Sequence, residues 1–141
     1  MRHYRLVTFI EDNISRLEPE VKEFSRRFHE GSPQNSALLN ALSNKLRGMY
    51  KFFDPVIAST IIQSFLAFID ACILENRRDY ETMPQSAGGE RWARYIRSKN
   101  GIPDGYALFN FPMDIFPDAS SYLQIIPDLG DIIIFGNDVL S

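Results

Sequence analysis

The sequence has very little cysteine, and its last forty-one residues contain no lysine or arginine. Cys72 is the single cysteine among 141 residues, which excludes a disulfide framework and fits a reducing, cytoplasmic compartment. All fifteen lysines and arginines lie before residue 100, whereas residues 101–141 carry six aspartates. A stretch without cations makes a poor nucleic-acid surface, because phosphate contacts require positive charge. We therefore expect no nucleic-acid partner.

Targeting segments and common enzyme motifs are also missing. The apolar run near the N-terminus is short and reaches Glu11-Asp12 without a small-residue cleavage site, so we expect no signal peptide. The longest apolar stretch, residues 56–74, is interrupted by polar residues and predicts a buried core helix rather than a membrane span. His3 and His29 lack the spacing of zinc ligands. No P-loop, dinucleotide-binding or Gly-x-Ser-x-Gly motif occurs.

Apolar residues in the first half of the chain recur at three- and four-residue spacing, which is typical of amphipathic helices. The pattern predicts a helix over 19–30, with Pro19 in its first turn and an end at Gly31. It predicts a second helix from about residue 38 to 52. Asp54-Pro55 is a typical helix start and predicts a long apolar core helix from 55 to about 77.

The second half of the chain is also predicted to be helical. We expect a loop over 79–90, a short helix near Trp92–Ile96 that Asn100-Gly101 stops, another short helix from Pro103, and a bend over 110–117. A last helix is predicted from Ser120 or Ser121 to Ser141, kinked or divided by Pro127. The run 132–135 leaves a short buried strand as an alternative. The predicted fold class is all-α, and the helical pattern stopping at Ser141 leads us to expect part of a larger domain.

Asn137 and Ser141 are the first candidate metal ligands. Residues four apart stand on the same face of a helix, so their amide and hydroxyl oxygens are stacked with Asp138 beside them. Such hard oxygen ligands are the kind that Mg²⁺ prefers. The alternative is that Asn137 and Asp138 cap the end of a helix.

Glu11-Asp12-Asn13 places two adjacent carboxylates and an amide after an apolar run. A cluster of this kind at a helix end can hold Mg²⁺ bound to substrate phosphates. The alternative is a solvated helix end with an Asx turn.

Arg91, Arg94 and Arg97 recur at three-residue spacing, which places their guanidinium groups roughly on one helical face. The planar fork of arginine binds two phosphate oxygens at once, so these residues are candidates for phosphate recognition. A solvated basic face is the alternative.

These segments together resemble class I terpene synthases. Residues 129–141, with Asn137-Asp138-Val139-Leu140-Ser141, resemble the second metal-binding motif of that family, Asn-Asp-x-x-Ser-x-x-x-Glu. Residues 95–101 are similar to the arginine-containing motif of fungal trichodiene synthases, with the match on Arg97, and residues 53–76 are similar to their central region. Counting back places the aspartate-rich first motif at residues 11–15, where Asp12 is the matched carboxylate.

The resemblance implies an α-helical bundle around an apolar cavity, of which this chain is the middle part. It implies a Mg²⁺-dependent sesquiterpene cyclase that ionises farnesyl diphosphate. Asp12, Asn137 and Ser141, with Glu11 as a further candidate, would bind Mg²⁺, and Asp138 would support the ligands. Arg97 would contact the diphosphate.

Two other functions remain open. The chain departs from the first motif at Glu11 and Ser15, and the closing Glu of the second motif would fall at position 145. These departures favour an inactive truncated or degenerate family member that acts as a non-catalytic helical module. An unrelated helical adaptor is the third possibility. We also expect self-association, including a possible homodimer, because a partial bundle exposes apolar surface.

Overall fold

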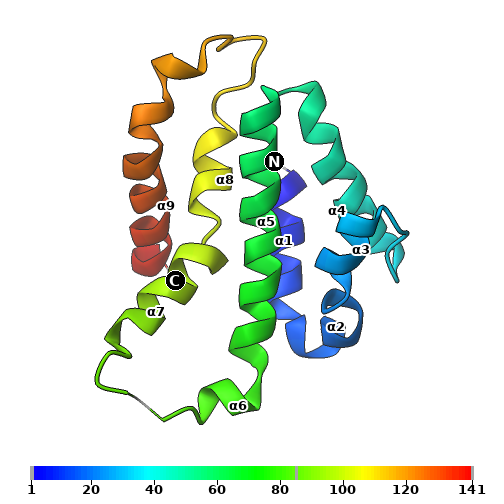
Figure 1. The fold of residues 1–141 in the computed structure, drawn as a ribbon, viewed down its shortest axis with the longest axis vertical. Helices are drawn as coiled ribbons and strands as arrows, with labels where there is room; N and C mark the ends of the chain where they lie inside the picture. Colours follow the sequence, from blue (N-terminus) through cyan, green and yellow to red (C-terminus); the bar gives the residue numbers. More distant parts are fainter. Residues whose placement is uncertain (1, 85, 141) are drawn as a thin grey trace.

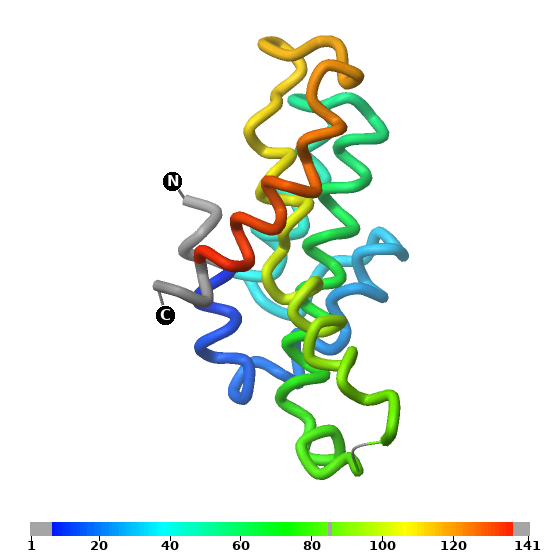
Figure 2. Tube along the Cα trace, turned by 90° about the vertical axis from the view of Figure 1, so that its left-hand side faces the viewer, coloured from blue at the N-terminus to red at the C-terminus, as the bar shows by residue number. Residues whose placement is uncertain are grey.

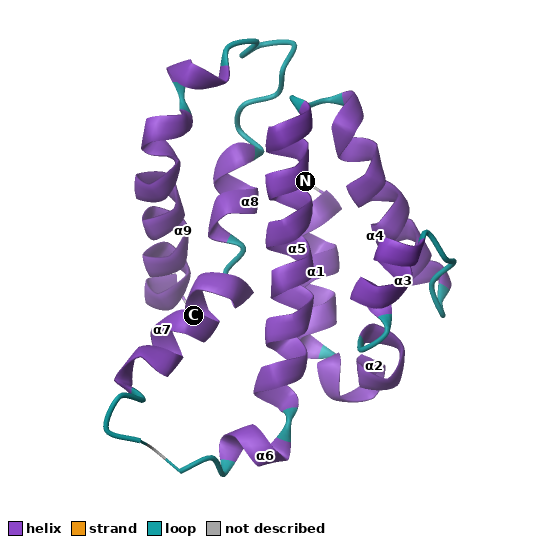
Figure 3. Ribbon diagram, in the orientation of Figure 1, coloured by secondary structure: helices purple, strands orange, loops and turns teal. Residues whose placement is uncertain are grey.

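The structure is a computed structural model that describes the backbone of residues 2–84 and 86–140, and the side-chain surroundings of residues 7–84 and 86–136. Every regular element in that part of the chain is a helix, which confirms the all-α class (Figure 3). The α-helices are α1 (Arg2–Asp12), α2 (Ile14–Val21), α3 (Phe24–Glu30), α4 (Ala37–Arg47), α5 (Pro55–Asn76), α6 (Arg78–Glu81), α7 (Glu90–Asn100), α8 (Pro103–Leu108) and α9 (Ile126–Leu140). Three short 3₁₀ helices are η1 (Gly48–Lys51), η2 (Ala119–Ser121) and η3 (Leu123–Ile125).

Helix α5 is the central element of the bundle (Figure 1). It begins as predicted, because the Asp54 side chain accepts a hydrogen bond from the Val56 amide at 2.8 Å and Pro55 occupies the first turn. It contacts α7 and α8 on one side and α2 and α3 on the other. The helix is long and apolar enough to cross a membrane, yet 56% of its most apolar 18-residue segment is buried inside the structure. We therefore assign it as a core helix.

Helices α8 and α9 pack closely against each other, and α9 crosses α8 obliquely (Figure 2). Gly130 of α9 permits the close approach, because a Cβ at this position would lie 3.1 Å from Cβ of Pro103 in α8. Gly105 permits a similar approach of α8 to α5, since its Cβ would lie 3.2 Å from Oγ of Ser64. The backbones can therefore meet where a larger residue would hold them apart.

The break between α7 and α8 differs from the glycine stop that the sequence predicts. Helix α7 ends at Asn100 as expected, but Gly101 keeps a right-handed conformation with φ −74°. The left-handed residue is Ile102, with φ 48°, and its side chain is fully buried. A left-handed β-branched residue costs about 1–2 kcal/mol, which the burial of its side chain offsets.

The first predicted helix is wrong in its boundaries. Pro19 lies inside α2 rather than at a helix start, and the chain breaks at Lys22-Glu23 before α3 begins. Proline removes one amide donor, and α2 ends two residues later, so little helix is disrupted. The predicted end at Gly31 is confirmed, because this residue has the left-handed φ of 72°.

Three further elements refine the predictions. The helix expected over 38–52 tightens into η1 at Gly48, and α6 forms inside the predicted 79–90 loop. The last helix begins at Ile126, so Pro127 lies in its first turn, where its missing amide has no helical partner to lose. The run 132–135 is helical, so the strand alternative is wrong.

Candidate functional site

Three charged residues from distant parts of the sequence act on one another at one end of the bundle. Glu11 comes from the end of α1, Glu75 from the end of α5 and Arg97 from α7. Burial of the Glu11 carboxyl raises its pKa above the ordinary value of 4.5, and the charges of Asp12 and Glu75 raise it further, whereas Arg97 lowers it. Of the predicted residues, Glu11 and Arg97 therefore come close enough for their charges to interact, and Asp12 adjoins Glu11 in the chain.

A small cavity of about 190 Å³ lies beside this cluster. Glu11 and Glu75 both line it, together with Cys72 of α5. Glu11 is exposed as a whole residue, but its place in this cavity wall removes part of the water around its carboxyl group. Two carboxylates facing one space repel each other, and a bound cation relieves such repulsion.

Asn100 connects α7 to the end of α5. Its side-chain amide donates to both carboxylate oxygens of Glu75, at 2.9 and 3.0 Å. Its Oδ1 accepts a hydrogen bond from Nη1 of Arg97 at 3.4 Å. Asn100 thereby holds the Arg97 guanidinium next to the Glu75 carboxylate.

The three arginines of α7 do not share one environment. Arg97 is half-buried, whereas Arg91 and Arg94 are exposed. Each step of three residues turns the side chain by about 60° around the helix, so only the last of the three faces the end of α5. Arg91 and Arg94 therefore match the alternative interpretation of these arginines, a basic helix face exposed to solvent.

Arg97 and Glu75 also line a larger cavity of about 450 Å³ between α5, α6 and α7. Tyr80 of α6 and Trp92 of α7 stack at its edge, with ring centroids 6.1 Å apart and an interplanar angle of 12°. An anion in this cavity would lie within reach of the Arg97 guanidinium and beside the stacked rings of Tyr80 and Trp92.

Two of the remaining residues of the predicted first motif, Asn13 and Ser15, form hydrogen bonds that stabilise the fold. Asp12 is exposed at the last position of α1. The Asn13 side chain donates to the carbonyl of Phe9 at 2.9 Å, so this amide caps α1. Ser15 donates its hydroxyl to Oδ1 of Asn76 at 2.8 Å, which ties α2 to α5.

The predicted ligands of the second motif fall at the end of α9. The backbone of Asn137 and Asp138 belongs to that helix, but their side chains lie outside the described residues, as does all of Ser141. Among the side chains that are described, no group of three His, Cys, Asp or Glu residues is arranged to hold a metal ion. The carboxylates of Glu11, Asp12 and Glu75 are of the chemical type that Mg²⁺ prefers, although these three residues are not arranged as such a group.

Cys72 is not a nucleophile. It is buried in α5, and burial together with the charges of Glu11 and Glu75 raises the pKa of its thiol to about 12. The reactive form of cysteine is the thiolate, so this side chain is inert at neutral pH.

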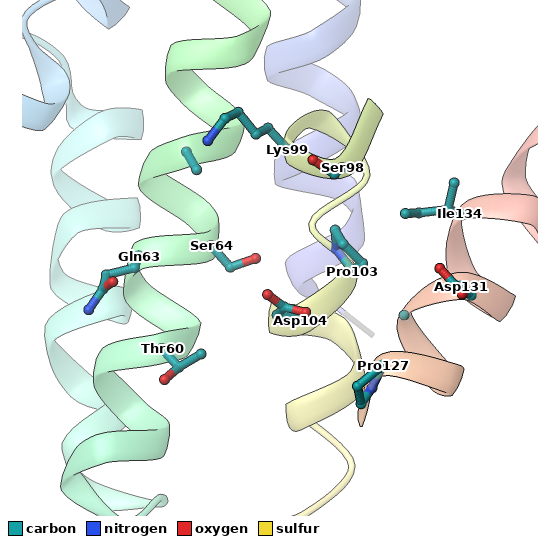
Figure 4. A pocket seen from close by; sticks show the side chains of 12 residues that line it. Thr60, Gln63, Ser64, Ser98, Lys99, Pro103, Asp104, Pro127, Asp131 and Ile134 are labelled. Carbon is teal, nitrogen blue, oxygen red and sulfur yellow. The ribbon is translucent and has the colours of Figure 1, made fainter. Parts of the chain in front are cut away.

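A further cavity, of about 550 Å³, lies between α5, α7, α8 and α9 (Figure 4). Its polar lining includes Ser64, Lys99, Asp104 and Asp131 (Figure 4). It contains none of the residues predicted for the metal or the diphosphate, and Ser64 serves the fold there by accepting a hydrogen bond from the Gly105 amide at 3.2 Å. We therefore place the candidate site at Glu11, Glu75 and Arg97.

Sequence reasoning missed Glu75 and Asn100. Asn100 lies three residues after Arg97, a spacing that places both on neighbouring positions of one helix, so this signal was present in the sequence. Glu75 lies 64 positions after Glu11, and only the tertiary fold brings the two residues to one cavity.

Comparison with known proteins shows the class to which this helical bundle belongs. The family model described as Trichodiene synthase (TRI5) matches residues 1–141. The chain therefore belongs to the trichodiene synthase family of fungal terpene synthases. This membership excludes the unrelated helical adaptor.

Several curated proteins are similar to the chain over most of its length. It is 37% identical over 136 residues to Terpene synthase BipA of Cochliobolus sativus, a match that covers 96% of this chain and 42% of that protein. It is 33% identical to Longiborneol synthase CLM1 of Gibberella zeae, covering 86% of this chain and 37% of the relative. Trichodiene synthase of Fusarium culmorum is 18% identical over 99% of the chain. The chain thus spans about two fifths of the length of these relatives.

Proposed function

We propose that this chain carries the diphosphate-binding part of a Mg²⁺-dependent sesquiterpene cyclase that acts on farnesyl diphosphate. The observation that carries the proposal is the meeting of Glu11, Glu75 and Arg97 at one end of the bundle. Carboxylates at a helix end beside a held arginine are suited to a divalent cation and a diphosphate, respectively. Family membership supports the same chemistry.

In the proposed site, Glu11 and Asp12 would hold Mg²⁺ from the end of α1, with Asn137 and Ser141 of the second motif as partners and Asp138 in support. When bound, Mg²⁺ neutralises diphosphate charge and makes the group a better leaving group. Arg97 would contact the diphosphate oxygens with its planar fork. Asn100 would keep that fork in position through its hydrogen bonds to Arg97 and Glu75.

Departure of the diphosphate from a farnesyl chain leaves an allylic cation. The developing negative charge on the leaving oxygens is stabilised by the guanidinium of Arg97, which is already oriented before the reaction. The cation would then cyclise against apolar and aromatic walls that exclude water. We place the chain within one helical domain of the cyclase, in a reducing compartment that suits its single buried thiol.

A non-catalytic helical module is the second candidate function. It is favoured by Ser15, which stands at the last acidic position of the family's first motif and bonds to Asn76 instead of offering a carboxylate. A chain of this kind would bind diphosphate without releasing it from a substrate.

The two functions are separated by measuring diphosphate released from farnesyl diphosphate, with and without MgCl₂, alongside binding of inorganic diphosphate. The cyclase predicts Mg²⁺-dependent release together with a hydrocarbon product detected by gas chromatography. Mg²⁺-dependent binding without release supports the non-catalytic module. Absence of both binding and release would refute the diphosphate site itself.

A further inference from the structure

A second cavity with a different chemical character lies at the opposite end of α5 from Glu75. It has a volume of about 730 Å³ and is lined by residues of α4, η1, α8 and the segments that follow η1 and α8. Small-molecule sites commonly have volumes of about 300–1,000 Å³. Phe53 precedes α5, so the length of this helix, about 1.5 Å for each of its residues, separates the cavity from the diphosphate site. The cavity is therefore independent of the proposed function.

The walls of this cavity are mostly apolar and aromatic. The ring of Phe109 lies 6.1 Å from that of Phe53 and 6.2 Å from that of Tyr106. Met49 is buried at the base, and Phe52 stays 61% exposed at the opening. The Met113 amide donates to the carbonyl of Phe52 at 2.8 Å, which fixes the loop after α8 against this wall. The backbone around the cavity is therefore held in place without a ligand.

The charge at the opening has one sign. Lys45 and Lys51 line the cavity, and no acidic residue does. The segment from 31 to 53 contains three basic residues and no acid, although the whole chain has a net charge of −3. Arg47 is occupied elsewhere, since it stacks over the Phe28 ring and donates to the Phe28 carbonyl. Neither lysine forms an ion pair within the described part of the chain.

The nearest acid in the sequence does not neutralise this opening. Asp54 follows Phe53, but its carboxylate caps α5 by accepting from the Val56 amide. Burial raises the pKa of the Tyr122 phenol, and the charges of Asp54 and Asp118 raise it further. An aromatic cavity rimmed by two ammonium groups is complementary to a molecule with an apolar body and an anionic head.

We propose that this cavity binds a single amphipathic anion, with its apolar chain among Phe53, Tyr106 and Phe109 and its carboxylate or phosphate between Lys45 and Lys51. The flexible lysine stems can bring both ammonium groups to one head group. The chain of the ligand would cover Phe52, whose exposed ring is otherwise unfavourable in water.

The test uses the 141-residue chain labelled with ¹³C at the methionine methyl groups. Met49 reports on the cavity, and Met83, which follows α6 and does not line this cavity, is the internal control. Four twelve-carbon probes are titrated below their micelle concentrations: dodecanoate, dodecyl phosphate, dodecanol and dodecyltrimethylammonium. We expect at least one of the two anions to shift the Met49 signal saturably, with a Kd about tenfold lower than those of the neutral and cationic probes, and Met83 to stay unchanged.

Two variants separate charge recognition from hydrophobic adhesion. Lys45→Gln combined with Lys51→Gln should raise the Kd of the anions about fivefold to tenfold without changing that of dodecanol, whereas Lys22→Gln on the far side of the bundle should change neither. Equal affinity for all four probes, or no shift of Met49, would overturn the proposal. A Met49 response to anionic phospholipid vesicles alone would assign the surface to membrane binding. A response to protein concentration alone would assign it to contact with a second copy of the chain. Either result would also overturn the proposal.

Discussion

The side-chain amide of Asn100 donates to both carboxylate oxygens of Glu75, at 2.9 and 3.0 Å. This pair of hydrogen bonds joins the last turn of α7 to the last turn of α5. Because Arg97 also bonds to Asn100, the position of the proposed diphosphate ligand depends on a residue that carries no charge. Asn100 is therefore a positioning residue in this account.

Replacing Asn100 by alanine should lower both stability and diphosphate affinity. Hydrogen bonds to a charged partner are worth about 1.5–3 kcal/mol when shielded, and solvent exposure of this pair reduces the expected loss to about 1 kcal/mol. Chemical denaturation measures the stability change, and calorimetry measures diphosphate binding in MgCl₂. Asn44→Ala, at an exposed position of α4, is the matched control. Equal effects of the two variants on affinity would contradict the positioning role.

Glu11→Gln should stabilise the folded chain at neutral pH. The pKa of Glu11 is raised above 4.5 by burial and by Asp12 and Glu75, so the folded state binds a proton more readily than the unfolded state. The protonated Glu11 carboxyl therefore contributes its full stabilisation below pH 4.5, the ordinary pKa. This stabilisation is lost as the pH rises through the raised pKa of the folded state. We expect thermal melts to show a gain of less than about 1 kcal/mol at pH 7 that disappears near pH 4.

The control for this change is Glu20→Gln on α2, which does not line the cavity beside Glu11 and should leave diphosphate binding unaltered. In the same variants, Glu11→Gln should weaken Mg²⁺-dependent diphosphate binding although it stabilises the fold. A variant that is both less stable at pH 7 and unchanged in binding would show that Glu11 is a structural residue rather than a metal ligand.

Gly105→Ala should destabilise the contact between α5 and α8. A Cβ at this position would lie 2.7 Å from Cγ2 of the buried Ile102 and 3.2 Å from Oγ of Ser64. Overpacking of this kind costs about 1–3 kcal/mol, measurable by urea denaturation. Gly48→Ala, where nothing lies within 4 Å of the added Cβ, should be neutral or slightly stabilising. A loss of equal size in both variants would contradict the packing argument.

The isolated chain should self-associate. Val56, Ile132 and Phe135 are 71%, 66% and 64% exposed, and exposed apolar surface drives association in water. Light scattering coupled to size-exclusion chromatography should give a mass that rises with concentration, and Phe135→Ser should reduce that rise. A monomer at every concentration would be inconsistent with this expectation.

The sequence predicts local features of this fold better than long-range ones. The start of α5 and the end of α3 follow from Asp54-Pro55 and Gly31, because capping depends on neighbouring residues. The position of Pro19 inside α2 and the left-handed Ile102 could not be predicted, since packing of whole helices overrides local preference there.

The candidate site shows the same limit. Asp12 and Arg97 are recognisable because each lies in a short motif. Glu75 belongs to no motif and joins the site only because the fold places it beside Glu11 in one cavity and beside Arg97 in another. Residues that act through tertiary contacts leave no periodic signal in a single sequence.

The most direct test of the diphosphate site is a calorimetric titration of the chain with inorganic diphosphate. It is carried out with and without MgCl₂ on the unaltered chain, Arg97→Ala and Arg94→Ala, because Arg94 is exposed on the same helix. The account predicts binding that requires Mg²⁺, a loss of affinity of about tenfold or more in Arg97→Ala, and no change in Arg94→Ala. Binding that is independent of Mg²⁺, or equally reduced in both variants, would contradict it.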